Sequence, residues 1–202
     1  MNKNDAIQLA QEIILSEVKA LQIVAEQLDS SFYKAVDLLA SCRGTVVVSG
    51  VGTTGTVARR FAHLLCNVGC PALFLHAGDS LHGSSGAVKP VDVLFLLSKT
   101  GETRETCSLA EIVEVRGTPI ISLTAEAESK LAQLSNVVIT IKTPPDVDPF
   151  DGLMAVGSSL AMESVCDALV FCVLKAKGTQ REYFVKGHPG GIINTLSEES
   201  PE

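Results

Sequence analysis

The sequence predicts an α/β fold, namely a three-layer sandwich with a five-stranded, parallel, doubly wound sheet and a pair of N-terminal helices. From residue 45 onward, short β-branched apolar runs alternate with longer segments of helical period. The candidate strands are apolar at nearly every position, which is typical of parallel strands buried on both faces. Because 202 residues suit one such domain, we expect a single domain over 1–202.

The N-terminal part predicts two helices, since apolar residues recur at a helical period over residues 5–28 and in a second segment that runs to about residue 41. Asp29, Ser30 and Ser31 separate them and are typical helix-capping residues. We therefore expect three parts: a helical arm over about 5–42, an α/β core over about 44–178, and a C-terminal active-site segment over about 179–195.

The core predicts strands and helices in strict alternation. The strands cover residues 45–50, 72–76, 91–98, 118–124 and 136–141, and the helices cover residues 56–69, 102–117, 127–134 and 154–177. In such a sheet, ligands bind at the carboxyl ends of the strands, where the strand order reverses. The residues that directly follow the first three strands are therefore the candidates for a site.

The turn after the first strand reads GVGTTG, residues 50–55, and has the G-x-G-x-x-G spacing of a dinucleotide site. An NAD site needs an acid at the end of the second strand to bind the ribose, but that strand ends at His76 and Asp79 comes three residues later. A small anion at the helix N-terminus is favoured over NAD, and a turn without any ligand remains the alternative. The candidate binding residues here are Gly52, Thr53 and Thr54.

The turn after the third strand, SKTGETRET, carries four hydroxyl residues around one glycine at a helix start, where a helix cap needs only one. Lys99 and Arg104 add positive charge that can offset a dianion. Since neither turn contains a P-loop lysine, the pair predicts a phosphorylated metabolite and not a nucleoside triphosphate. The candidate substrate-binding residues of this turn are Ser98, Lys99, Thr100 and Thr103.

Two histidines lie in glycine-containing loops, His82 in HAGDSLHG and His188 in KGHPGG. Histidine is suited to proton transfer near neutral pH, so we expect both to act on or contact the substrate. Glu105 and the acids at 146–151 are possible carboxylate partners, although a solvated acidic loop explains the latter equally well. Of the other two histidines, we expect His63 to be packed or at the surface and His76 to be structural.

The composition limits the classes of partner that the protein is expected to bind. A formal charge of −7 and a pI near 5.1 argue against nucleic acid. Six cysteines in apolar segments are expected to be buried, reduced thiols, and they form no zinc-site pattern. Glu163 and Asp167 interrupt the apolar run 157–175, so no membrane span is expected. Together with the lack of an apolar leader-like block, this predicts a cytoplasmic protein without a metal.

The stretches GVGTTG, HAGDSLHGSSG, SKTGETRE and GHPGG occur in this order and resemble the motifs of the sugar-isomerase (SIS) family, specifically its arabinose 5-phosphate isomerases. The resemblance covers about residues 10–195. It implies an aldose–ketose isomerase that interconverts D-ribulose 5-phosphate and D-arabinose 5-phosphate through an enediol, without a cofactor. The family's product leads to Kdo, a sugar of lipopolysaccharide and capsule.

The resemblance also implies site residues. Ser98, Thr100 and Thr103 would hold the phosphate together with the first turn, while His82, His188 and Glu105 match active-site residues of the family. A further family glutamate falls on or near Asp146, in a loop that carries an insertion here. The sequence departs from the family pattern at two positions. Thr53 replaces the family lysine of the first turn, and Lys99 stands where the family usually has asparagine and is expected to restore that cation.

The resemblance implies a homodimer or homotetramer with shared active sites. Many relatives carry paired regulatory CBS modules after the SIS domain, and we expect a form that lacks them. Two other functions stay open: a non-catalytic sugar-phosphate sensor, and an isomerase of another ketose phosphate such as a heptose or hexulose phosphate.

Overall fold

The sheet of the protein has five parallel strands, and a computed structural model describes residues 1–189 of the chain. The strands are β1 (Val46–Ser49), β2 (Ala72–Phe74), β3 (Val93–Leu97), β4 (Ile120–Thr124) and β5 (Val137–Thr140), in the spatial order β2-β1-β3-β4-β5. The chain passes from β1 to one side and then returns to place β3 on the other. The strand order therefore reverses between β1 and β3, which confirms the predicted doubly wound sheet.

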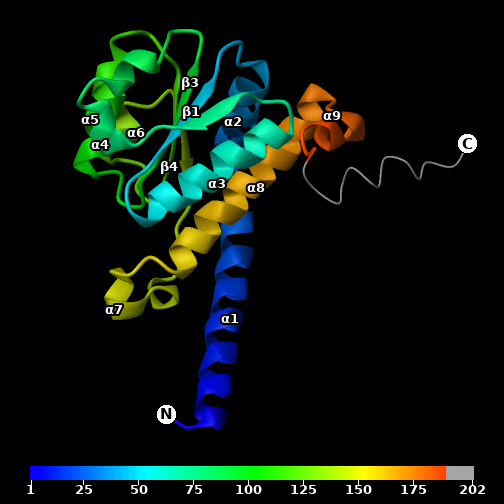
Figure 1. Cartoon of the computed structure of the whole chain (residues 1–202). Coiled ribbons are helices and arrows are strands. Elements are labelled where there is room, and N and C mark those ends of the chain that lie inside the picture. Colours follow the sequence, from blue (N-terminus) through cyan, green and yellow to red (C-terminus); the bar gives the residue numbers. More distant parts are fainter. Residues whose placement is uncertain (190–202) are drawn as a thin grey trace, which may run out of the picture.

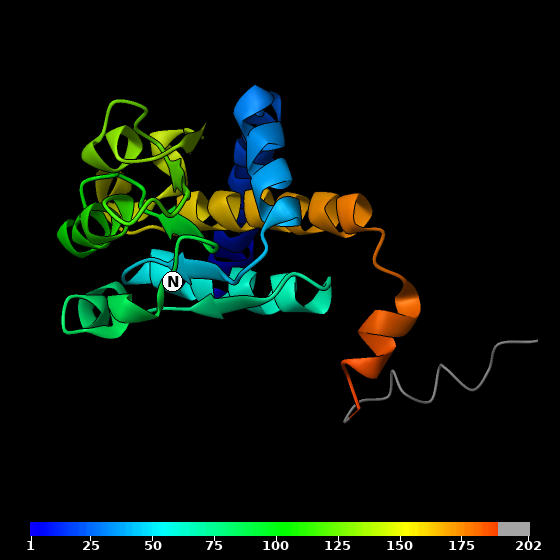
Figure 2. The same cartoon turned by 90° about the horizontal axis from the view of Figure 1, so that it is seen from above.

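Helices cover both faces of this sheet (Figures 1 and 2). One face packs against α1 (Lys3–Glu26), α2 (Ser30–Ser41), α3 (Thr53–Asn67) and α8 (Gly157–Lys177), and the other packs against α4 (Ala77–Ser80), α5 (Arg104–Glu114) and α6 (Lys130–Gln133). Alternate residues of each strand serve the two layers, since Phe95 lies in the core beneath α3 and Leu94 and Leu96 lie in the core beneath α5. The predicted three-layer architecture is confirmed.

The long apolar helix α8 is a core helix of this sandwich. Within residues 1–189, it is the one helix long and apolar enough to span a membrane by length and composition, and half of that apolar window is buried inside the protein. Its residues Ala161, Met162 and Val165 belong to the same buried cluster as Phe61, whose ring meets that of Phe95 edge-on at 4.8 Å between centroids. Packing against α1, α2 and α3 explains its apolar composition.

The boundaries of several elements differ from the prediction. Helix α3 begins at Thr53, immediately after the first turn, and α8 begins at Gly157, after a loop that the sequence assigns to the helix. Five short elements were not predicted, because segments of three to six residues show no measurable periodicity. They are α4 (Ala77–Ser80), η1 (Ser84–Ala87), η2 (Pro145–Val147), α7 (Pro149–Gly152) and α9 (Arg181–Lys186).

Helix α1 extends away from the rest of the molecule as an arm, on the side where α7 lies (Figure 1). Only Ala20 and Val24 of this helix are buried. Six large apolar side chains of the arm are exposed: Ile7, Leu9, Ile13, Ile14, Leu15 and Val18. A soluble monomer rarely exposes apolar side chains in such density, and such surfaces usually mark a protein contact.

The prediction of six buried cysteines is wrong for two of them. Cys66 and Cys172 are exposed and Cys42 is half-buried, whereas Cys70, Cys107 and Cys166 are buried; all six are free thiols. The exposed pair lies on the outer sides of α3 and α8, which carry apolar residues beyond their core-facing stripes. Burial raises the pKa of Cys70 to about 11 and also raises that of Cys166, so both thiols are held protonated and unreactive.

Candidate active site

The turn between β1 and α3 is shaped by close backbone contacts. A Cβ on Gly50 would lie 2.7 Å from the Thr54 carbonyl oxygen, and one on Gly55 would lie 2.9 Å from the Gly50 carbonyl oxygen. Gly52 has φ +60°, a conformation that favours glycine. Each glycine of the G-x-G-x-x-G pattern therefore has a structural reason, and the spacing by itself gives no support to a dinucleotide.

The two threonines of this turn differ in what they can offer. The Thr54 hydroxyl donates to the Val51 carbonyl at 2.9 Å and accepts from the Val51 N–H at 3.3 Å, so it stabilises the turn itself. Thr53 is the exposed first residue of α3. The first N–H groups of a helix lack intrahelical partners, so the start of α3 offers amides and the Thr53 hydroxyl to an anion.

The turn between β3 and α5 is shaped by side-chain hydroxyls. Ser98 is buried, its Oγ lies 2.9 Å from the Thr103 hydroxyl, and it accepts from the Gly101 N–H at 3.0 Å. The Thr100 hydroxyl accepts from the Glu102 N–H at 3.2 Å. Because β1 and β3 are paired neighbours, this turn lies beside the first turn at the point of reversed strand order. The structure thus brings both predicted phosphate turns to one edge.

Lys99, which was expected to offset the substrate's charge, is paired with groups of its own chain. Its Nζ donates to the Asp148 carboxylate at 2.7 Å and to the Gly152 carbonyl at 2.9 Å. The Asp148 side chain is 1% exposed, so this cation is paired with a buried anion in the loop before α8. The sequence places Asp148 among several loop acids without a specific role, because nothing in a local pattern indicates a partner 49 positions away.

Asp148 is held ionised by its surroundings. Its burial raises the pKa, but this is outweighed by hydrogen bonds from the Lys99 ammonium and from the Ser158 and Val156 backbone amides. The pKa of Asp148 therefore lies below the ordinary aspartate value. Its second oxygen binds those two amides at 3.0 and 2.8 Å, respectively, and so caps the start of α8.

The two predicted catalytic acids occupy different places. Glu105 is half-buried in the first turn of α5, directly after the hydroxyl-lined turn. Asp146 is exposed in η2 and lines a cavity of about 450 Å³ together with Leu9, Glu12 and Ile13 of α1. The structure thus places Glu105 beside the phosphate turns and Asp146 between this edge of the sheet and the arm.

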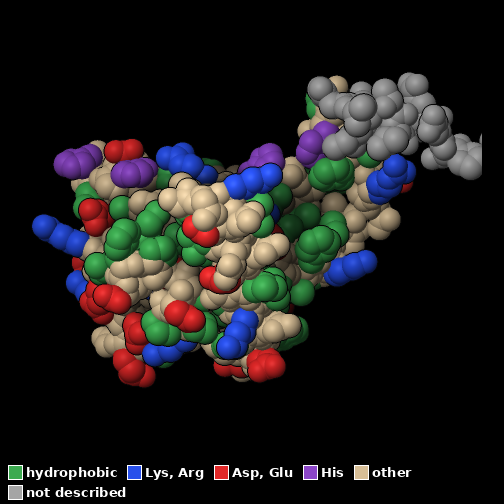
Figure 3. Space-filling view, turned by 90° about the horizontal axis from the view of Figure 1, so that it is seen from below, with side chains coloured by type: hydrophobic (Ala, Val, Ile, Leu, Met, Phe, Trp, Pro, Cys, Tyr) green, Lys and Arg blue, Asp and Glu red, His purple; other side chains and the backbone are tan. Residues whose placement is uncertain are grey.

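His82 lies after α4, in the loop that follows β2, and its side chain is exposed. Its backbone N–H donates to the Asp79 carbonyl at 3.0 Å, which fixes the loop without using the imidazole. His76, expected to be structural, is exposed too, with Nδ1 3.8 Å from Asp79 Oδ2. Figure 3 shows histidines along one border of the molecule, where they are accessible.

His188 lies far from the two turns of its own chain. Its Nδ1 is 2.7 Å from the Phe184 carbonyl oxygen, its ring is 4.1 Å from the Phe184 ring, and it shares a cavity with Cys66 and Asn67 near the end of α3. Helix α3 has 15 residues and is therefore about 22 Å long, with the first turn at its other end. Gly190 and Gly191 of the motif, and the predicted segment up to residue 195, lie outside the described residues.

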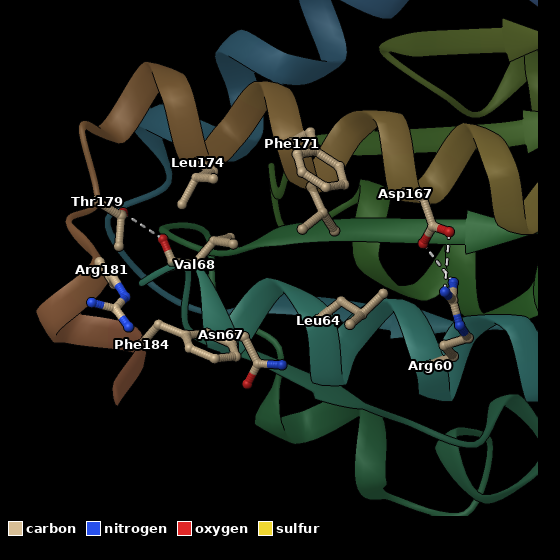
Figure 4. A pocket seen from close by; sticks show the side chains of 11 residues that line it. Arg60, Leu64, Asn67, Val68, Asp167, Phe171, Leu174, Thr179, Arg181 and Phe184 are labelled. Carbon is tan, nitrogen blue, oxygen red and sulfur yellow. Dashed lines mark hydrogen bonds and ion pairs between the residues drawn. The ribbon is translucent and has the colours of Figure 1, made fainter. Parts of the chain in front are cut away.

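A groove of about 510 Å³ runs between α3, α8 and α9 (Figure 4). Leu64, Phe171 and Leu174 give it an apolar floor and walls, and the Arg60–Asp167 ion pair, with a shortest distance of 2.5 Å, closes one end. The sequence did not indicate this groove, since its residues come from three helices. It continues towards the region that holds His188, because Phe184 lines both cavities.

Comparison with known proteins gives consistent matches. The SIS domain family matches residues 38–171. The arabinose 5-phosphate isomerase KdsD of Escherichia coli K12 is 32% identical over 189 residues, which cover 94% of this chain and 57% of that protein. This chain thus spans just over half the length of such relatives.

Two solved structures are similar over nearly the whole chain. Escherichia coli CFT073 c3406, in complex with arabinose 5-phosphate, has a TM-score of 0.89 and 32% identity and covers 94% of this chain and 100% of that one. A candidate sugar-phosphate isomerase from Listeria monocytogenes has a TM-score of 0.90 and 28% identity, with coverage of 94% and 100%.

Proposed function

Because the chain belongs to the SIS domain family, we propose that it is an aldose–ketose isomerase that interconverts D-ribulose 5-phosphate and D-arabinose 5-phosphate. The observation that carries the proposal is the hydroxyl-lined turn of Ser98 and Thr103, which lies beside the amide-rich start of α3 at the point of reversed strand order. Support comes from the 32% identity to c3406, whose structure contains arabinose 5-phosphate.

The phosphate is assigned to the two turns. The Ser98–Thr103 hydroxyls and the N-terminal amides of α3 and α5 supply hydrogen-bond donors, and the α3 and α5 helix dipoles favour a dianion at this position. Thr53 contributes a hydroxyl where the resembling family carries a lysine. The sugar then extends from the phosphate towards Glu105 and the loop that carries His82.

Isomerisation moves a proton between C1 and C2 of the open-chain sugar. A base removes the proton from the carbon next to the carbonyl while an acid protonates the carbonyl oxygen, which gives an enediol. A proton is then removed from the other enediol hydroxyl and one is added to the former carbonyl carbon, which gives the isomeric sugar. His82, His188, Glu105 and Asp146 are the candidates for these transfers, and hydrogen-bond donors stabilise the enediolate. These steps move protons only, so the reaction needs no redox cofactor.

The distance of His188 from the turns of its own chain supports a site shared between subunits. We assign it to the site of a neighbouring copy within a homodimer or homotetramer. The exposed apolar arm of α1 and the apolar groove beside α9 provide surfaces for such contacts. Light scattering is expected to give the mass of a dimer or tetramer, and a monomeric mass at assay concentration would contradict this assignment.

Incubation with ribulose 5-phosphate, without added cofactor, tests the activity through the appearance of arabinose 5-phosphate. Other ketose phosphates, including a heptose and a hexulose phosphate, run in parallel to reveal a different substrate. Binding of these sugars without turnover of any would support a sensor and reject the isomerase. His82→Ala and His188→Ala are each expected to lower kcat by about 10²-fold or more, while His63→Ala, on the exposed side of α3, is the matched control.

The cellular setting follows from the same proposal. Six free thiols fit a reducing compartment such as the cytoplasm. Arabinose 5-phosphate made there would serve as the precursor of Kdo, for lipopolysaccharide or capsule. Deletion of the gene followed by measurement of cellular Kdo tests this assignment.

A further inference from the structure

Three parts of the chain meet at the Lys99 side chain. Lys99 belongs to the phosphate turn after β3, Asp148 belongs to the loop 145–152, and the Asp148 carboxylate caps the start of α8. One ammonium group thus links the turn to the loop through the carboxylate and, separately, through the Gly152 carbonyl. Both bonds are short, at 2.7 and 2.9 Å.

The linked loop is conformationally costly on its own. Phe150 and Asp151 have φ values of 56° and 55°, in the left-handed region that residues with side chains rarely adopt, and Gly152 follows at 88°. Phe150 and Leu153 are 73% and 87% exposed, so core packing contributes little to holding them. Val147 is buried at the start of the loop, whereas residues 150–153 depend on a few specific contacts to keep their shape, and the Lys99 bond to the Gly152 carbonyl is among them.

The charges indicate that Lys99 serves the loop and not the phosphate directly. The Asp148 carboxylate already neutralises the ammonium group, and the lysine is only one-third exposed. Moving it to a substrate phosphate would leave a buried carboxylate without its cation, which is strongly unfavourable. The Lys130–Glu111 ion pair has a similar length, 2.6 Å, but both of its side chains are exposed, so neither charge depends on the other for burial.

We propose that Lys99 is a positioning residue whose bonds to Asp148 and Gly152 hold the loop 145–152, and with it Asp146, in fixed relation to the phosphate turn. The proposal rests on the proposed isomerase function for its kinetic consequence. Its structural consequence, an ordered loop, is independent of that function. A positioning residue acts on the rate of the bound substrate, so its loss lowers kcat more than it changes KM.

Hydrogen exchange tests the structural part first. Lys99→Met and Asp148→Asn are each expected to speed amide exchange at residues 146–156 by about tenfold or more, while amides of β3 and β4 are unchanged. Lys130→Met, which removes an exposed ion pair of similar length, is the control and is expected to leave this loop unchanged. Unchanged exchange in both site variants would overturn the proposal, whether or not the protein is an isomerase.

Kinetics with ribulose 5-phosphate test the functional part. Lys99→Met is expected to lower kcat about tenfold or more with KM changed less than about threefold, because misplacing a catalytic group affects the reaction step. Asp148→Asn keeps the shape of the side chain and serves if the lysine variant fails to fold. The double variant is expected to lose no more than the worse single variant, since both remove the same link.

The outcomes separate the two proposals. A KM increase of about tenfold with unchanged kcat in Lys99→Met would make Lys99 a direct phosphate ligand and overturn the positioning role. Absence of turnover by the wild-type protein with every sugar phosphate would reject the isomerase, and the exchange experiment would still decide whether Lys99 orders the loop.

Discussion

The turn after β1 and the turn after β3 lie side by side at one edge of the sheet, and they are built in different ways. In the first turn, Gly50 and Gly55 leave out side chains so that strand and helix backbones can approach each other. The second turn also contains one glycine in the left-handed region, Gly101 at φ 67°, but Ser98 and Thr103 add hydroxyls that bond to each other and to the Gly101 N–H. Glycine spacing therefore reports close packing in the first turn, whereas the hydroxyls of the second turn form its internal hydrogen bonds and are the groups that the proposed function assigns to the phosphate.

The largest effect is expected from a side chain placed in the first turn. Gly50→Ala puts a Cβ 2.7 Å from a backbone carbonyl oxygen that cannot move freely, so the free energy of unfolding is expected to fall by about 3 kcal/mol. Urea denaturation measures the loss. Gly86→Ala is the control, because a Cβ there meets no atom within 4 Å. Equal stability of the two variants would show that close backbone packing does not require glycine in the first turn.

The second turn is tested by removing a hydroxyl. Ser98→Ala deletes the group that holds both the Gly101 N–H and Thr103, so kcat/KM for the sugar phosphate is expected to fall by about 30-fold. Steady-state kinetics measures it, and Ser164→Ala on α8 is the control. A fall that tracks only lost folding stability, with normal turnover in the folded fraction, would assign the hydroxyl to structure alone.

A cation added to the first turn sharpens the comparison. Thr53→Lys places a positive charge at the exposed start of α3, and KM for the sugar phosphate is expected to fall by about threefold to tenfold. The effect should weaken in high salt, since the charge is exposed to solvent. Thr56→Lys, one turn further along α3, provides the control for charge alone. If both variants lower KM equally, the first turn does not contact the phosphate.

Acidification tests the ion pair that anchors the second turn to the loop before α8. The pKa of Asp148 is lowered in the folded protein, so its contribution to stability is present above the ordinary aspartate pKa of about 4 and is lost as the pH falls below it. Chemical denaturation between pH 7 and pH 3 is expected to show a stability advantage of the wild type over Asp148→Asn that shrinks in this range. An advantage that grows on acidification would contradict the lowered pKa.

The layers of the fold were predictable from the sequence because they depend on local periodicity. Buried runs such as VVVS of β1 and VLFLL of β3 are apolar at almost every position, which identifies parallel strands without knowledge of their partners. Helix α3 was found for the same reason, with its start misplaced by three residues, because the sequence does not indicate whether a turn's threonines belong to the helix.

The site was predictable only in part because it depends on contacts between distant segments. Ser98 and Thr103 form one turn, and their clustering was visible along the chain. The partner of Lys99 was not, since a long flexible side chain can reach in several directions and the choice depends on a buried carboxylate from another loop. Cys66 and Cys172 were misassigned because an apolar neighbourhood in sequence does not indicate which side of a helix faces out.

The 15 residues of α3 separate the first turn from His188 by a distance that no side chain spans. In genetic terms, the proposed shared site predicts intragenic complementation. A Ser98→Ala chain retains a normal histidine and a His188→Ala chain retains a normal turn, so mixed oligomers of these two impaired variants are expected to contain some sites with both normal parts. Recovered turnover in such mixtures would identify α3 as the element that divides one active site between two subunits.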